Sequence, residues 1–230
     1  MNLFERTTGV KSWSLRYLLL TYRLDQLWLP AAFWALFAVM AVILRGGDQV
    51  YNLARGLIGG VLPLLGGIMA AYVVLDDPAL ELQFSTPAPA HETLIERLGL
   101  TFVIIAITAL SYQLFLMALG VNLSRWTDPW SFQLTWSVPS LVFLALGSAA
   151  AFALGNCVSG AMLVGLVWIV EFIARDWFLG DRWLQYVMVF MALIAPEHPN
   201  LRANLIVLSA LAALLFVLAW ALLKKQERYL

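Results

Sequence analysis

The sequence predicts an all-α membrane protein with six transmembrane helices, an N-terminal interfacial helix and a re-entrant segment before the last span. Three observations predict this class: the composition, the spacing of the charged residues and the turn-forming residues between apolar stretches. Hydrophobic residues make up 62% of the 230 residues and charged residues only 12%, against about 25% charged residues in soluble proteins. A soluble fold of this size could not bury so much apolar surface. We therefore expect a single transmembrane domain over residues 1–230.

The spans follow from the charge spacing. Crossing a hydrocarbon core about 30 Å thick takes about 20 helical residues, and five long stretches contain no Asp, Glu, Lys or Arg. The stretch from Pro129 to Val170 is long enough for two spans, and its middle, from Gly155 to Gly160, reads G-N-C-V-S-G. Such a cluster predicts a tight turn between two helices. The six predicted spans cover residues 27–44, 56–75, 98–120, 134–154, 159–177 and 203–223.

Two further segments are predicted to lie at the membrane without crossing it. Residues 11–24 carry apolar side chains at helical spacing, with Arg16 and Arg23 on another face. This pattern predicts an interfacial helix on the cytoplasmic leaflet, although the segment could equally be a basic anchor that only fixes the topology. The uncharged stretch from Trp183 to Pro196 is too short for a span. We interpret it as a re-entrant or interfacial hairpin.

Six spans place both termini on the same side of the membrane, and the basic residues indicate which side that is. Basic residues near the spans are retained on the cytoplasmic side. Eight lie on the side of the termini and six on the other. The first set is Arg6, Lys11, Arg16, Arg23, Arg97, Lys224, Lys225 and Arg228. The second is Arg45, Arg55, Arg125, Arg175, Arg182 and Arg202. We expect both termini in the cytoplasm.

The predicted cytoplasmic loop 76–97 has the residues of an ordered connection. Asp77 can cap a short helix that starts at Pro78, and Pro87 and Pro89 then end it before a second helix begins near Ala90. A short capped helix on such a loop offers a rigid contact to a soluble partner. An ordinary helical connection with a proline turn is the alternative. The expected contact residues are Glu81, Gln83, Phe84, Ser85 and Thr86.

Several chemistries have no motif in this sequence. No Gly-Lys pair is present, so the phosphate-binding loop of a nucleotide-hydrolysing enzyme is missing. The two histidines, His91 and His198, fall in predicted loops, and Cys157 is the single cysteine. The formal net charge is zero, which gives no sign of nucleic-acid binding. We therefore expect no catalytic residues, no metal site and no cofactor in this chain, and not an enzyme.

Glu171 is the acid that stands among apolar residues inside a predicted span. A carboxylate there is expensive unless it faces a cavity or a partner. It could line a substrate path or a subunit seam, or it could pair with Arg175 four residues on.

Small residues at four-residue spacing predict close helix packing. They form two sets: Gly147, Ala151 and Gly155, and Gly56 and Gly60. Tryptophans at predicted helix ends fit interfacial belts; they are Trp28, Trp126, Trp130, Trp177 and Trp183.

Taken together, these features resemble the membrane subunits of ABC-2 type exporters, which are six-span permeases that pair with a separate ATP-binding-cassette ATPase. The resemblance covers nearly the whole chain. It rests on the N-terminal helix, the short turn between the fourth and fifth spans, the re-entrant segment and the basic K-K-Q-E-R tail. The most family-like string is L-E-L-Q-F-S-T-P at Leu80 to Pro87, which continues through A-P-A into H-E-T-L-I-E-R-L.

The resemblance implies a division of labour. Residues 78–86 would be the coupling helix that docks on the ATPase, and the N-terminal helix would be the elbow that moves with it. Two permease subunits, identical or related, would bind two ATPases, which carry the ATP and Mg, in a prokaryotic plasma or inner membrane. Glu171 would lie near the subunit seam. The substrate stays open between lipids, glycoconjugates, peptides and drugs.

Two other readings of the sequence remain. A haem-exporter-like permease of cytochrome maturation also has six spans and about this length, although no predicted span offers a haem ligand. A membrane scaffold or assembly factor that transports nothing would have the same composition. Co-purification of an ATPase subunit separates the exporter from the scaffold.

Overall fold

The computed structural model describes residues 27–45, 49–75, 90–121 and 129–224, and all regular structure in these ranges is helical. Four helical stretches are long and apolar enough to cross a membrane. They are Gln49–Leu75, Leu94–Ala118, Trp130–Leu154 and Leu201–Leu223. Two apolar helices of 16 and 17 residues, α2 (Trp28–Ile43) and α8 (Cys157–Ile173), are shorter. The all-α membrane class is confirmed. The predicted interfacial helix 11–24 lies outside the described residues.

The second predicted span begins seven residues earlier than expected. It consists of α3 (Gln49–Arg55), a π-helical turn η3 (Gly56–Val61) and α4 (Leu62–Leu75), which follow one another without a break. We refer to this element as helix 49–75. Arg55 was expected to flank the span, but it lies within the helix, because the segment Gln49–Arg55 is already helical and buries Val50 and Ala54. A π-helical turn inside an α-helix is rare and often marks a functional position.

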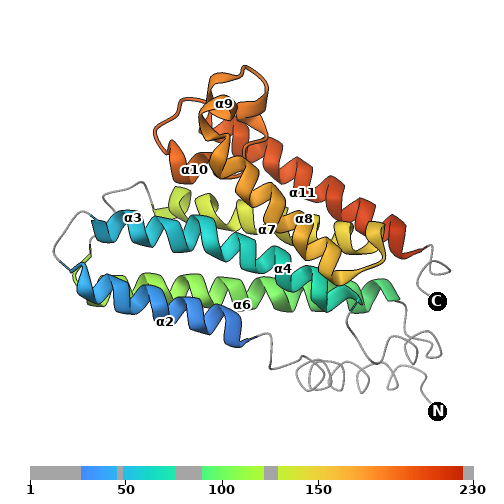
Figure 1. The fold of residues 1–230 in the computed structure, drawn as a ribbon, viewed down its shortest axis with the longest axis horizontal. Coiled ribbons are helices and arrows are strands. Elements are labelled where there is room, and N and C mark those ends of the chain that lie inside the picture. Colours follow the sequence, from blue (N-terminus) through green and yellow to red (C-terminus); the bar gives the residue numbers. More distant parts are fainter. Residues whose placement is uncertain (1–26, 46–48, 76–89, 122–128, 225–230) are drawn as a thin grey trace, which may run out of the picture.

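The other long helices are α6 (Ala90–Ala118), α7 (Pro129–Leu154) and α11 (Leu201–Leu223). Figure 1 shows three layers: α2 and α6 on one side, α4 and α7 in the middle, and α8 and α11 on the other side. Packing between helices agrees with these layers, since α4 contacts α6, α7 and α8, and α7 contacts α11. Helix 49–75 and α7 are accordingly the most buried long helices.

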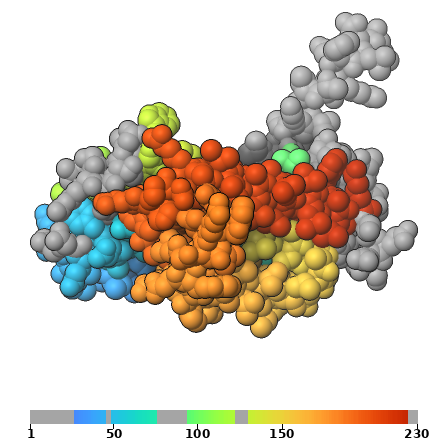
Figure 2. Space-filling model, turned by 90° about the horizontal axis from the view of Figure 1, so that it is seen from above, coloured from blue at the N-terminus to red at the C-terminus, as the bar shows by residue number. Residues whose placement is uncertain are grey.

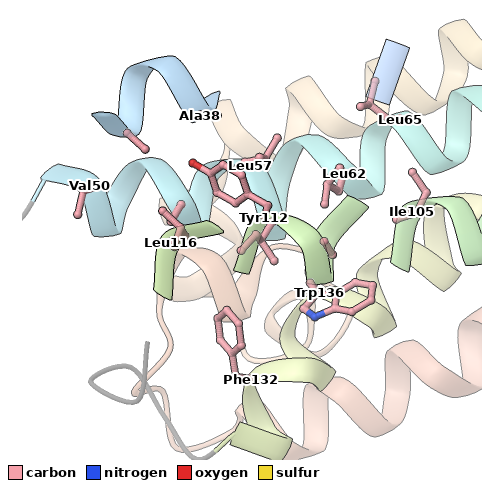
Figure 3. Packing of buried hydrophobic residues seen from close by; sticks show 14 of the residues in the cluster. Ala38, Val50, Leu57, Leu62, Leu65, Ile105, Tyr112, Leu116, Phe132 and Trp136 are labelled. Carbon is pink, nitrogen blue, oxygen red and sulfur yellow. The ribbon is translucent and has the colours of Figure 1, made fainter. Parts of the chain in front are cut away.

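Consecutive helices alternate in direction, as Figure 1 shows. One buried cluster joins Val74, Leu94, Phe152 and Leu223, so the end of α4, the start of α6, the end of α7 and the end of α11 lie together. We call this the terminal end of the bundle. A second cluster, drawn in Figure 3, gathers residues of α2, helix 49–75, α6 and the start of α7. Within it the Tyr112 hydroxyl donates to the Phe37 carbonyl at 3.2 Å.

Glycine lets the central helices touch through their backbones. A Cβ atom on Gly147 of α7 would lie 2.0 Å from the Gly67 carbonyl oxygen of α4, and one on Gly160 of α8 would lie 2.8 Å from the Ala151 nitrogen. Gly147 and Ala151 therefore pack as their spacing predicted. Gly155 does not, because it ends α7 with φ +64 in the predicted turn, where Asn156 caps α8 through the N–H groups of residues 158 and 159.

Candidate functional site

The connection between α8 and α11, residues 174–200, is the part of the described chain with the least regular backbone. It contains only the short helices α9 (Arg175–Gly180), η5 (Leu184–Tyr186) and α10 (Met191–Ile194). It joins the ends of α8 and α11 that lie away from the terminal end and stands above α4 and α7 in Figure 1, and Figure 2 shows it against α8 and α11 on one face. In a membrane protein, irregular backbone of this kind needs partners from the protein, because lipid supplies none.

Glu171 of α8 supplies the first of these partners. Its side chain is 4% exposed, and one carboxylate oxygen accepts the backbone N–H groups of Val189 at 2.9 Å and Phe190 at 3.2 Å. These N–H groups directly precede α10, where a helix start leaves donors without intrahelical partners. The carboxylate therefore satisfies backbone groups of the connection.

This contact differs from the ion pair that the i,i+4 spacing offered. Arg175 lies 3.7 Å from Asp176, and these two side chains are 57% and 91% exposed. The fifth helix is shorter than predicted, because α8 ends at Ile173 and Ala174 leaves helical geometry with ψ +16. Arg175 therefore begins a separate helix, α9, and its side chain is exposed whereas Glu171 is buried.

Asn204, in the first turn of α11, supplies the second partner. The residue is fully buried, and its amide nitrogen lies 2.9 to 3.1 Å from the carbonyl oxygens of Gln185, Tyr186 and Met188. Its own carbonyl oxygen has no hydrogen-bond partner among the described residues. One side-chain amide thus binds three backbone carbonyl groups of residues 185–188, which attaches this segment to α11.

Arg55 supplies the third partner, from the other side of the connection. Its guanidinium donates to the Leu193 carbonyl in α10. Leu193 can approach helix 49–75 because glycine occupies two facing positions: a Cβ atom on Gly59 would lie 3.6 Å, and one on Gly60 3.2 Å, from Leu193 side-chain atoms. The Trp168 indole donates to the Gly60 carbonyl at 3.0 Å, so α8 also contacts the π-helical turn.

Aromatic side chains fill the space beneath α10. Phe190, directly before α10, is fully buried. Its ring centroid lies 5.4 Å from that of Phe143 and 5.1 Å from that of Phe172. Trp168 packs on Phe172 at 4.6 Å. Such aromatic contacts stabilise beyond their area alone, so α10 has both a polar and an apolar attachment. We call Arg55, Glu171, Asn204 and this aromatic cluster the seat of α10.

Residues 175–183 of the connection carry exposed aromatic and charged side chains. Trp177 and Trp183 are 65% and 73% exposed, so their rings are accessible for the interfacial belt that the sequence predicts. Trp28 and Trp130 are exposed as well, and Trp126 lies outside the described residues. Asp181 accepts the N–H groups of Trp183 and Leu184 at 2.7 and 2.9 Å. These two donors hold the pKa of Asp181 below its usual value.

The other predicted site residues lie outside the described part of the chain. They are Glu81, Gln83, Phe84, Ser85 and Thr86. Of the seat, Glu171 was singled out in the sequence, whereas Arg55 and Asn204 were not. Arg55 was counted as a charge flanking a span. The sequence did contain a signal for Asn204, because a polar side chain near the start of a long apolar stretch needs a partner inside the membrane.

In the described ranges, no His, Cys, Asp and Glu side chains form a group that could hold a metal ion.

The helices and their apolar surfaces define the class: the protein is a helical membrane protein. The seat adds that irregular backbone is held inside the bundle by polar side chains. Comparison of the chain with protein-family models, with curated proteins and with solved structures found no match.

Proposed function

We propose that the protein is the membrane-spanning subunit of an ATP-driven exporter of the ABC-2 type, which moves its substrate with the energy of a separate ATPase chain. The six spans would be α2, helix 49–75, α6, α7, α8 and α11, with residues 183–196 of the connection as the re-entrant segment. Both termini would lie in the cytoplasm of a prokaryotic cell, and the protein would be a multi-pass protein of its plasma or inner membrane.

The observation that carries the proposal is the seat of α10. A segment without continuous helical hydrogen bonds is packed between α8, helix 49–75 and α11, with its N–H and C=O groups bound by Glu171, Arg55 and Asn204. Irregular backbone is tolerated at membrane depth where protein buries it or where it lines a water-filled cavity. This supports the predicted re-entrant segment before the last span, which is one of the features on which the resemblance to these exporters rests.

The loop after α4 is the proposed link to the energy source. It starts at Leu75 and ends at Ala90, so it connects two helices at the terminal end of the bundle. ATP and Mg would bind the partner ATPase, and this chain would carry no catalytic residue. Two ATPases and a second permease subunit, identical or related, would complete the transporter.

The test is purification of the tagged protein from its native membrane in a mild detergent. We expect an ATPase subunit in stoichiometric amount, and we expect the double variant Glu81→Lys, Phe84→Ala to lose it. Glu96→Lys is the matched control, because Glu96 is an exposed acid outside the 78–86 segment. Recovery of the protein without any ATPase would contradict the proposal and favour a membrane scaffold. If both variants recover equal amounts of the ATPase, the assignment of residues 78–86 as the coupling segment would be wrong.

A further inference from the structure

We propose that α10 is a strut that ties the first half of helix 49–75 to α8, and that Arg55 and Glu171 are its positioning residues. The attachment of α10 by these residues does not depend on the proposed function, because all of its contacts lie within this chain. Its part in transport rests on the function proposed above.

The two charged side chains bind opposite ends of α10. Glu171 accepts the N–H groups of Val189 and Phe190 just before the helix begins. Arg55 donates to the carbonyl of Leu193, one residue before the helix ends. A helix of four residues cannot satisfy these groups by itself, since each helix end leaves its first donors and last acceptors unpaired. Charged partners make stronger hydrogen bonds than neutral ones, so both ends of α10 are firmly fixed.

The two anchors belong to different spans. Arg55 is the last residue of α3 and precedes the π-helical turn, while Glu171 lies near the end of α8. A cation on one helix and an anion on the other are thus linked through α10 instead of binding each other. α10 therefore adds a polar link between these two helices to the direct contact that Trp168 of α8 makes with the Gly60 carbonyl.

The apolar contacts favour a strut that stays in place over a flap that opens. Phe190 is fully buried against Phe143 of α7 and Phe172 of α8, and Met188 and Met191 on either side of it are fully buried too. Lifting α10 from its seat would separate all of these side chains from their neighbours and leave Glu171 as a buried carboxylate without its donors. A rigid attachment keeps both the apolar contacts and the hydrogen bonds to Glu171.

A rigid strut would let helix 49–75 pass its movements to α8. The helix runs without interruption from Gln49 to Leu75, where the proposed coupling loop begins. A displacement of that loop by the ATPase would travel along the helix to Arg55 and through α10 to Glu171. Coupling over such a distance requires a contiguous chain of packed elements, and this path consists of helix, strut and helix.

A disulfide between helix 49–75 and α10 tests the attachment. The Cβ position of Gly59 lies 3.6 Å from the Leu193 Cβ, which is within the range of natural disulfides. We suggest Gly59→Cys, Leu193→Cys in a Cys157→Ser background, with purified protein in nanodiscs. The rate of disulfide formation under mild oxidation, followed by maleimide gel shift, reports how firmly α10 is seated.

Loss of either anchor should slow the reaction. We expect Arg55→Gln to lower the rate about fivefold, the equivalent of one lost hydrogen bond of about 1 kcal/mol. Glu171→Ala should lower it further, because it removes the acceptor of two hydrogen bonds. Glu171→Gln should lower it less, because an amide oxygen still accepts N–H groups. Asp176→Asn, which removes an exposed carboxylate of α9, is the matched control and should leave the rate unchanged. Circular dichroism verifies that each variant is folded. Equal rates in folded variants would mean that apolar packing alone holds α10, and the positioning role would be wrong.

The complex with the ATPase tests the rigid role. With the disulfide formed, ATP hydrolysis by the complex in proteoliposomes should equal that of the reduced protein, because strut and helix move together. A loss of hydrolysis that a reductant reverses would show that α10 must leave its seat, which overturns the strut. Failure to obtain any ATPase complex contradicts the proposed function instead, while the disulfide rates of the isolated chain still decide the attachment.

Discussion

The centre of the bundle and the connection 174–200 are held together in opposite ways. At the centre, α4, α7 and α8 touch through glycine, with Gly147 against Gly67 and Gly160 against Ala151. In the connection, Glu171, Asn204 and Arg55 bind backbone groups of a segment that contains only short helices. The centre of the bundle is held together where glycine has no side chain, and the connection is held together by polar side chains.

The difference follows from how each backbone satisfies its own hydrogen bonds. A continuous helix pairs its N–H and C=O groups internally, so neighbouring helices need only fit together, and small residues let them approach. An interrupted backbone leaves such groups open, and lipid cannot bind them. Side chains from three surrounding helices must do so in this protein. The polar residues Glu171, Asn204 and Arg55 are therefore explained by the backbone N–H and C=O groups that they bind.

The largest effect is expected from filling the glycine contact. In Gly147→Ala the new methyl group would lie 2.0 Å from the Gly67 carbonyl oxygen, so α4 and α7 must separate. We expect a loss of about 3 kcal/mol or more in the free energy of unfolding, measured by SDS titration in mixed micelles. Gly165→Ala in α8 is the control, because no atom lies within 4 Å of that Cβ position. Equal stability of the two variants would contradict the backbone contact.

A smaller effect is expected from breaking the polar region. Asn204→Leu conserves the approximate size of the side chain but removes the donor for three carbonyl oxygens. We expect a loss of about 2 kcal/mol in the same titration, and faster hydrogen exchange over residues 185–190. Ser209→Ala serves as control, since its hydroxyl binds Leu205 within the same helix. A variant as stable and as protected as the control would exclude Asn204 as an anchor.

The smallest effect is expected where the two regions meet. Trp168→Phe keeps an aromatic ring against Phe172 but removes the hydrogen bond to the Gly60 carbonyl. We expect a loss of about 0.5–1 kcal/mol, and less than this for Trp177→Phe, which changes an exposed ring. A loss as large as that of Asn204→Leu would indicate that the two regions do not behave as separate units.

The sequence was a good guide to the helices because lipid imposes a simple rule on length and charge. The hairpin at Gly155 and Asn156 followed from its turn residues, and helix 49–75, α6, α7 and α11 fall where apolar stretches predicted spans. The ends were less predictable. Arg55 lies inside helix 49–75 although it was used to delimit a span, because a long side chain can extend from a helix to a polar partner. The helix expected to begin near Ala90 does begin there, as α6.

The site was predictable only in part. The position of Glu171 among apolar residues correctly marked it as a residue that needs a partner. The partner itself could not be derived, because the N–H groups of Val189 and Phe190 are 18 and 19 residues away, and helical spacing offers only neighbours such as Arg175. Leu193 and Arg55 are separated by 138 residues. Contacts of this kind depend on how the helices pack.

The position of Asn204 in the chain has a consequence for biosynthesis. Arg55 and Glu171 precede α10, so both anchors of the strut already exist when α10 leaves the ribosome. Asn204 follows the three carbonyl groups that it binds, at residues 185, 186 and 188. These groups gain their partner only after the first turn of α11 has been made. Insertion of the last helix is therefore the step that completes the irregular segment, and a chain truncated at residue 200 would leave it unfinished.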